Sequence, residues 1–183
     1  MKELWDAYDR EGNALGFDLV RGEPCPDDVY HLVAEIYSVT HDGRVLVTQR
    51  HPNKTWGLHW EITGGSVVKG EDPIRGALRE LKEETGLSAK EEDLIPVYVQ
   101  TGMGLTGCPG IFHSFLVFFD PEEETICLQE SETVDYKLLP YEEYKQFVMS
   151  DAFTAGIRER FLLHRDRFDR MIGEHTERYE RGM

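Results

Sequence analysis

The segment between Asp72 and Gly86 carries the start and stop signals of one short helix. Asp72 suits the N-cap, Pro73 suits the first helical position, and Gly86 suits the left-handed residue after the last turn. These signals predict a helix from residue 73 to residue 85. Runs rich in aliphatic and β-branched residues, which are typical of strands, lie on both sides of this helix. The chain is therefore predicted to be a mixed α/β protein.

Strand-like runs separated by turn signals recur along the chain as far as residue 139. The predicted strands are, in chain order, residues 3–8, 14–20, 31–39, 44–50, 94–100, 111–119 and 133–139. The dipeptide Asp42-Gly43, a strong hairpin signal, separates the third strand from the fourth. A glycine-rich stretch from Gly102 to Gly110 follows the fifth strand. From Tyr141 onward apolar residues recur at helical spacing, which predicts a helical C-terminus.

The length of 183 residues fits one domain, and no internal repeat or low-complexity linker marks a second one. We predict an N-terminal hairpin extension at residues 1–29, a core at residues 30–145 and a C-terminal helical segment at residues 146–183. The C-terminal segment carries charges of both signs. This composition favours a solvated amphipathic helix that docks on the core, with a homodimer contact as the alternative.

The charge and hydropathy of the chain limit its partners. A formal net charge of -15 repels phosphate backbones, which argues against a nucleic-acid polymer as partner. No window approaches the roughly 20 apolar residues that cross a bilayer, so no membrane partner is expected. The N-terminus lacks the apolar stretch of a signal peptide, and the expected compartment is the cytoplasm. A small anionic substrate would need cations supplied locally.

The chain has three cysteines, Cys25, Cys108 and Cys127. Their number is odd and their spacing is not that of a metal site, so neither a disulfide framework nor a zinc site is suggested. Free thiols in a reducing compartment are the prediction.

Three glutamates, Glu80, Glu83 and Glu84, share one face of the predicted helix, because residues three and four apart stack over successive turns. Like charges at these spacings destabilise a helix by roughly 0.2–0.5 kcal/mol per pair. Arg79 can pair with Glu83, but one guanidinium cannot neutralise three carboxylates. Divalent cations such as Mg²⁺ prefer carboxylate oxygens, and a bound metal turns an acidic patch into a phosphate-binding one. The pattern therefore indicates a metal site.

Gly65, Glu71 and the run from Arg79 to Leu87 stand at the spacing of the Nudix box, with no fixed position missing. The chain thus resembles the Nudix hydrolase superfamily, and the flanking segments are similar to that family from about residue 30 to residue 145. The resemblance implies an α/β/α sandwich with a mixed sheet, here with an N-terminal hairpin and a C-terminal helix. It also implies a metal-dependent hydrolase in which water attacks a phosphorus atom of a diphosphate.

The resemblance implies roles for particular residues. The metal-binding and base-forming carboxylates would be Glu80, Glu83 and Glu84. Arg79 would orient a neighbouring glutamate, and the carbonyl of Gly64 or Gly65 would add a metal ligand. Mg²⁺ or Mn²⁺ is the cofactor that these roles imply. Many family members use a further acidic residue from a later loop or strand, for which Glu130 is the first choice and Glu132 the reserve.

Residues on the substrate side are less constrained by the sequence. Arg50 and Lys54 lie ahead of the box and are candidates for contacts with substrate phosphate, with a solvated loop as the alternative. Trp60 is a candidate for stacking on a base, with a place in the core as the alternative. His31, on an apolar strand, is interpreted as a buried histidine with its hydrogen bonds satisfied.

The expected substrate is a small-molecule diphosphate, with a nucleoside diphosphate-linked compound favoured. One alternative is an enzyme similar to isopentenyl-diphosphate isomerases, because the N-terminal hairpin resembles that of the superfamily branch to which those isomerases belong. Gly64 stands where those isomerases carry a catalytic cysteine, and Ser66 stands where they carry a metal-binding histidine, so this alternative loses its acid and a ligand. A second alternative is a regulatory Nudix module that binds nucleotides without catalysis, although such modules often lose box residues.

Overall fold

The computed structural model describes residues 2–105 and 107–182. The strands are β1 Leu4–Tyr8, β2 Ala14–Val20, β3 His31–Thr40, β4 Arg44–Arg50, β5 Trp60–Glu61, β6 Thr63–Ser66, β7 Ile95–Met103, β8 Pro109–Phe119 and β9 Thr133–Pro140. The α-helices are α1 Pro73–Thr85, α2 Tyr141–Phe147 and α3 Ala155–Glu180. Every predicted strand is present to within a few residues. Thr106, in the glycine-rich stretch, lies outside the described residues.

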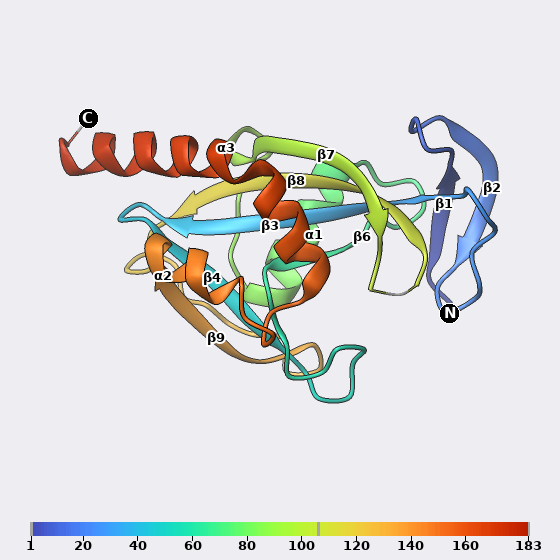
Figure 1. The fold of residues 1–183 in the computed structure, drawn as a ribbon, viewed down its shortest axis with the longest axis horizontal. Coiled ribbons are helices and arrows are strands. Elements are labelled where there is room, and N and C mark those ends of the chain that lie inside the picture. The colour runs from blue at the N-terminus through green and yellow to red at the C-terminus, as the bar shows by residue number, and fades with distance from the viewer. Residues whose placement is uncertain (1, 106, 183) are drawn as a thin grey trace.

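Seven strands form one mixed sheet with β3 near its centre (Figure 1). The main path of the sheet has the order β5-β4-β3-β8-β7, while β6 pairs with β3 and β9 pairs with β4. β8 runs parallel to β3, whereas β4 and β6 run antiparallel to it. The register of β6 against β3 sets Gly65 opposite Ala34 and Gly64 opposite Glu35. The glycine pair is therefore held against the central strand.

Alternation of side chains along β3 builds a core on each face of the sheet. Ala34 and Ile36 point to one face and pack with Leu81 of α1. Tyr37 points to the other face and packs with Phe161 of α3. Helices thus cover both faces, which confirms the predicted α/β/α sandwich.

Helix α1 begins and ends at the residues that its signals predicted. The Asp72 side chain accepts a hydrogen bond from the Arg75 N–H at 2.9 Å. At the other end Gly86 has φ 75°, and its N–H donates to the Lys82 carbonyl. Local capping chemistry therefore sets both ends of the helix.

The hairpin of β1 and β2 stands apart from the main sheet and has a small core of its own (Figure 1). Trp5 and Leu19 are buried in this core together with Cys108, which directly precedes β8. A disulfide bond joins Cys25 to Cys108, with 5.5 Å between their Cα atoms. The prediction of three free thiols is therefore wrong for this pair, while Cys127 is free and exposed. Sequence spacing could not show the pair, because 83 residues separate the two cysteines and only the fold brings them together.

The C-terminal segment docks on the sheet through one face of α3. Ile157, Phe161, Phe168 and Ile172 are buried on this face. Packing continues into the C-terminal half of α3, where His175 stacks on Phe118 of β8 with 3.4 Å between ring centroids, and the last turns of the helix reach the end of the sheet (Figure 1). Within the described residues no helix has an apolar stretch long enough to span a membrane.

Candidate functional site

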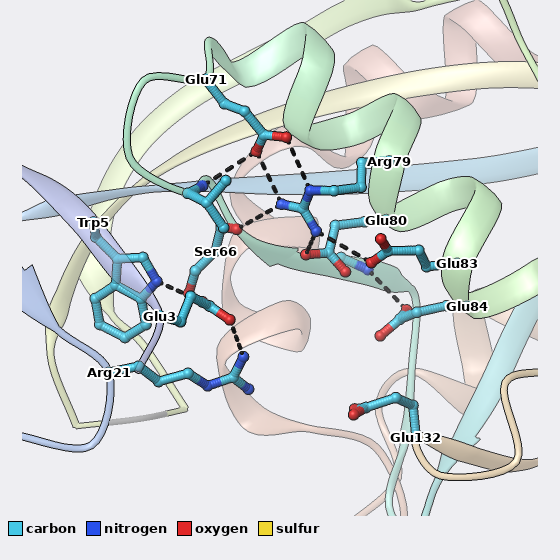
Figure 2. A network of polar contacts seen from close by, with 12 residues as sticks. Glu3, Trp5, Arg21, Ser66, Glu71, Arg79, Glu80, Glu83, Glu84 and Glu132 are labelled. Carbon is cyan, nitrogen blue, oxygen red and sulfur yellow. Dashed lines mark hydrogen bonds and ion pairs between the residues drawn. The ribbon is translucent and has the colours of Figure 1, made fainter. Parts of the chain in front are cut away.

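The three glutamates lie near the C-terminal end of α1 (Figure 2). The glycine pair of β6 lies against two of them, Glu80 and Glu84. The three glutamates differ in exposure, because each one points in a different direction around the helix axis. The Glu83 side chain is 52% exposed and that of Glu80 is 14% exposed. Glu84 is buried, with 4% of its surface exposed. The predicted carboxylate face therefore runs from solvent into the interior of the protein.

Arg79 lies among four acceptors and orders the carboxylates around it (Figure 2). Its guanidinium donates to Glu71 at 2.9 and 3.0 Å, to Glu80 at 2.7 Å, to Glu83 at 3.3 Å and to the Ser66 carbonyl at 3.1 Å. Burial disfavours the charged guanidinium, but the bonds and charges of Glu71 and Glu80 outweigh burial and raise the pKa of Arg79. Arg79 thus remains charged and couples the start of α1 to its glutamates.

The glycine pair lets the sheet and the helix approach each other closely. A Cβ atom at Gly65 would lie 2.2 Å from a carboxylate oxygen of Glu80. A Cβ atom at Gly64 would lie 2.6 Å from the carbonyl oxygen of Ala34. Each position therefore excludes any other residue without movement of its surroundings.

Glu84 carries a buried charge that the protein compensates poorly. Among the described residues, the one hydrogen bond to its carboxylate comes from the Gly64 N–H at 3.3 Å. Burial raises the pKa of Glu84 well above its usual value, and the charges of Glu61 and Glu80 raise it further. Burial also raises the pKa of Glu80. An added cation beside these carboxylates would relieve both the burial and the repulsion.

The carboxylates of α1 are the donors that this region could offer to a divalent metal. Within residues 2–105 and 107–182, no group of three or more histidine, cysteine, aspartate or glutamate side chains is arranged as a metal site. Arg79 instead takes up one oxygen of Glu80 and one of Glu83. The chemistry of the donors nevertheless fits Mg²⁺ or Mn²⁺, since Glu84 and Glu80 are carboxylates with little exposure, whose pKa burial raises, and both lie against the glycine pair.

Arg50 and Lys54 form the wall opposite α1, and both are paired with acids. Arg50 is buried and donates to both carboxylate oxygens of Glu61, at 2.7 and 2.6 Å. Lys54 forms an ion pair with Glu132. The alternative of a solvated loop is therefore wrong for Arg50, because a buried guanidinium requires its carboxylate partner.

The structure brings the reserve acidic residue, and not the first choice, to the site. Glu130 is exposed, and no ion pair to it is formed within the described part of the chain. Glu132 is partly buried beside Lys54, and in Figure 2 its carboxylate points into the same region as that of Glu84. Both residues lie in the turn of residues 130–132 that precedes β9, in which the Glu132 N–H donates to the Gln129 carbonyl at 2.8 Å.

Trp60 lies in the core and not in the site. It is 7% exposed, packs on Phe147 with 5.7 Å between ring centroids, and has the Lys137 ammonium 4.3 Å from its ring centroid. Stacking of Trp60 on a substrate base is therefore wrong, and the core alternative is confirmed. His31 is buried as predicted, with its Nδ1 3.1 Å from the Pro109 carbonyl and its Nε2 3.3 Å from Ser66 Oγ.

One cleft joins this region to the N-terminal turn of α3. Gly64, Gly65 and Lys54 line the end of the cleft near α1, while Glu35 and Arg160 line it further along. Neither Glu35 nor Arg160 was among the site residues predicted from the sequence. Glu35 could have been noticed because it shares a strand face with Val33 and Tyr37, so a charged residue stands among apolar ones on one face of β3.

A model of the NUDIX domain matches residues 29–161. The chain belongs to the Nudix family. A Nudix hydrolase of Listeria innocua is 26% identical over 153 residues, which cover 82% of this chain and 88% of the relative. An ADP-ribose pyrophosphatase of Bacillus subtilis is 33% identical over 129 residues, 66% of each chain. The chain spans only 38% and 21% of the lengths of two Nudix hydrolases of Arabidopsis thaliana that it also matches.

Solved structures share the Nudix fold at low sequence identity. A protein from Deinococcus radiodurans superposes with a TM-score of 0.71 at 16% identity, covering 88% of this chain and 99% of that one. A bifunctional NMN adenylyltransferase/ADP ribose pyrophosphatase from Francisella tularensis, whose structure contains AMP and manganese, superposes with a TM-score of 0.59 at 20% identity. That superposition covers 75% of this chain and 42% of the other. These likenesses establish the fold of this Nudix chain.

Proposed function

We propose that this Nudix chain hydrolyses the diphosphate linkage of a nucleoside diphosphate-linked compound with the help of Mg²⁺ or Mn²⁺. The observation that carries the proposal is the buried carboxylate of Glu84, which faces Glu61 and Glu80 and has a single backbone donor. A buried charge without a partner is expensive to maintain. Glu80 and Glu83 lie on the same helix face as this carboxylate, so the site has the donors for a cation and for a phosphate that the cation neutralises.

The residues that would hold the metal are Glu80, Glu83 and Glu84, with the Gly64 carbonyl and Glu132 as further ligands and Glu130 as the alternative to Glu132. When bound, the metal would lower the pKa of a water molecule and offset the charge of the diphosphate. Arg79 would act as a positioning residue, because it fixes one oxygen each of Glu80 and Glu83. Lys54 is the cation on the opposite wall, where it is available to a phosphate oxygen.

The reaction requires one water molecule and one proton acceptor. Water adds its oxygen to one phosphorus atom, and the bond from that phosphorus to the bridging oxygen breaks. The leaving phosphate keeps the bridging oxygen, and one of the α1 glutamates accepts the proton of the attacking water. The raised pKa of Glu84 and Glu80 makes either carboxylate a better base than an exposed glutamate.

The structure leaves no room at position 64 for the catalytic cysteine that the isomerase alternative requires. A cysteine at position 64 would place its Cβ atom against the Ala34 carbonyl, 2.6 Å away. The binding-only alternative gains no support from the site, since the three carboxylates and Arg79 are all present.

The decisive experiment compares Glu84→Gln with the native chain in a panel of nucleoside diphosphate compounds with Mg²⁺ or Mn²⁺. We expect hydrolysis to fall by about 10²-fold to 10⁴-fold, the usual range for loss of an acid–base group. Mn²⁺ affinity, measured by titration calorimetry, should fall as well. Glu122→Gln, at an exposed turn, is the matched control and should change neither quantity.

Unfolding would not explain the loss in Glu84→Gln. Because burial raises the pKa of Glu84, its ionised form opposes folding at neutral pH, and a neutral glutamine removes that opposition. The variant should therefore melt at the same temperature as the native chain or higher. Unchanged hydrolysis in the variant would disprove the mechanism, and no hydrolysis of any compound by the native chain would favour the binding-only alternative.

A further inference from the structure

A buried ion pair lies in the same cleft as the glycine pair, at the first turns of α3. Glu35 of β3 and Arg160 of α3 have side chains that are 5% and 8% exposed. The Arg160 Nε donates to the two carboxylate oxygens of Glu35 at 3.0 and 3.1 Å, and its Nη2 donates to Glu35 Oε1. The Tyr98 hydroxyl donates to Glu35 Oε2 at 2.7 Å. The charge of Glu35 is therefore neutralised by Arg160, and the ion pair holds Arg160 in place.

The guanidinium of Arg160 has two sides with different surroundings. Its central carbon lies 3.7 Å from the ring centroid of Phe112, which fixes its orientation. Nη1 forms no hydrogen bond with any acceptor in the described residues. Gly156 lies beside this nitrogen, and a Cβ atom there would be 3.2 Å from Nη1. Gly156 and Arg160 both line the cleft, so the missing side chain at Gly156 leaves space next to the free donor.

The cleft thus offers two kinds of polar group to one ligand. Lys54 and Glu61 line the end of the cleft at the glycine pair, and the free Nη1 stands near α3, with the apolar side chains of Phe112 and Ile157 beside it. A ligand whose diphosphate lies near α1 would extend its attached group towards Arg160. That group would meet a guanidinium that neither moves freely nor has its hydrogen bonds satisfied.

We propose that Arg160, held by Glu35 and Tyr98, is a specificity-determining residue that donates from Nη1 to an oxygen acceptor on the group attached to the diphosphate. The inference rests on the proposed function and narrows its substrate class to groups that carry a carbonyl or an anionic oxygen. A hydrocarbon group would cover the guanidinium and leave a buried donor unpaired. Sites built around such donors discriminate strongly against analogues that lack the acceptor.

The test measures equilibrium binding and does not depend on turnover. The probes are UDP and GDP, whose bases carry carbonyl groups, and isopentenyl diphosphate, whose attached group is a hydrocarbon. Binding is measured by titration calorimetry with Mg²⁺, using the methylene-bridged analogue of each probe, which cannot be hydrolysed, so that the α1 glutamates stay in place. We expect UDP or GDP to bind about 10-fold to 100-fold tighter than isopentenyl diphosphate, the effect of one hydrogen bond to a charged group.

The variant Arg160→Lys keeps the positive charge and removes the planar guanidinium with its fixed donors. The affinities of UDP, GDP and isopentenyl diphosphate should then agree to within a few-fold. Because Arg160→Lys could disturb the ion pair, the double variant Glu35→Gln with Arg160→Met replaces the buried charges by neutral groups of similar size. It should lose the preference too. Arg165→Lys, on the same helix with its side chain 48% exposed, is the matched control and should keep it.

The outcomes separate this inference from the proposed function. A preference that survives both Arg160 variants, or no preference in the native cleft, would overturn the role of Arg160 even if hydrolysis depends on Glu84. A preference that disappears with Arg160 while no probe is ever hydrolysed would support the role of Arg160 and overturn only the proposed reaction.

Discussion

At the scale of single residues, this Nudix chain buries three carboxylates and compensates each one differently. Glu35 has a guanidinium and a tyrosine hydroxyl, Glu61 has the guanidinium of Arg50, and Glu84 has one backbone N–H. The first two are ion pairs that shape the cleft. The third is the poorly compensated one, and it is also the residue whose pKa is raised well above its usual value by burial. Compensation therefore separates structural carboxylates from the one that is free to bind a cation.

His31 provides a prediction at this scale. Burial between Trp5 and Ser66 lowers its pKa from 6.5 to about 4, although the Pro109 carbonyl opposes the change. Above pH 6.5 the histidine is neutral in both states and adds no pH dependence. Between pH 6.5 and pH 4 only the unfolded chain binds the proton, so stability should fall by about 1.4 kcal/mol per pH unit from this group.

The measurement is the free energy of unfolding in urea at pH 7.5 and at pH 5. His31→Gln removes the titrating group and keeps an amide that can bond to the Pro109 carbonyl. The native chain should lose about 2 kcal/mol more than the variant over this interval. Equal losses in the two proteins would contradict a buried neutral His31.

At the scale of elements, the N-terminal hairpin is held to the rest of the chain by a small core and one covalent bond. The hairpin bonds to β3 through Tyr8 and Tyr30, and Lys69 N–H donates to the Leu4 carbonyl at 2.8 Å. The disulfide joins the segment after β2 to the residue before β8. The loop before Cys108 contributes Gly104 and Leu105 to the cleft, so the bond ties the hairpin to a wall of the site.

Removing this bond with Cys25→Ala and Cys108→Ala should lower the free energy of unfolding by about 2–4 kcal/mol, because a long loop is released in the unfolded chain. Limited proteolysis should then cut first between residues 21 and 30. Cys127→Ala, at the exposed free thiol, is the matched control and should leave stability unchanged. Thiol titration of the denatured native chain should find one thiol, and three thiols without added reductant would contradict the disulfide.

At the scale of the whole molecule, α3 covers one face of the sheet and completes the core on that side. Its buried face packs on the same core as β3 and β7, with the ring centroid of Phe168 4.3 Å from that of Tyr37 and 6.2 Å from that of Tyr98. The same helix supplies Arg160 to the cleft. The segment predicted to dock on the core as an amphipathic helix thus contributes both to stability and to the cleft.

Phe168→Ala should lower the free energy of unfolding by about 3–5 kcal/mol, because a fully buried aromatic side chain leaves a cavity. Leu163→Ala, on the exposed side of α3, should change it by about 0.5 kcal/mol or less. Far-ultraviolet circular dichroism and tryptophan fluorescence should report one common transition. An early separate transition in Phe168→Ala would contradict the prediction that residues 1–183 form one domain.

The sequence alone was sufficient for features that depend on neighbours along the chain. Caps at Asp72 and Gly86 set the ends of α1, and helical periodicity placed Glu80, Glu83 and Glu84 together. The strands followed from local alternation and turn residues. These features need no knowledge of distant segments, because they arise within a few residues of each other.

Only the tertiary structure decided contacts between distant segments. Glu35 and Arg160 are 125 residues apart, and Cys25 and Cys108 are 83 residues apart. Their meeting depends on the parallel pairing of β3 with β8 and on the docking of α3, and no local signal encodes either one. The same holds for the burial of Trp60. Pairing and packing of whole elements determined these contacts, since residues far apart in the chain meet only after the sheet has formed.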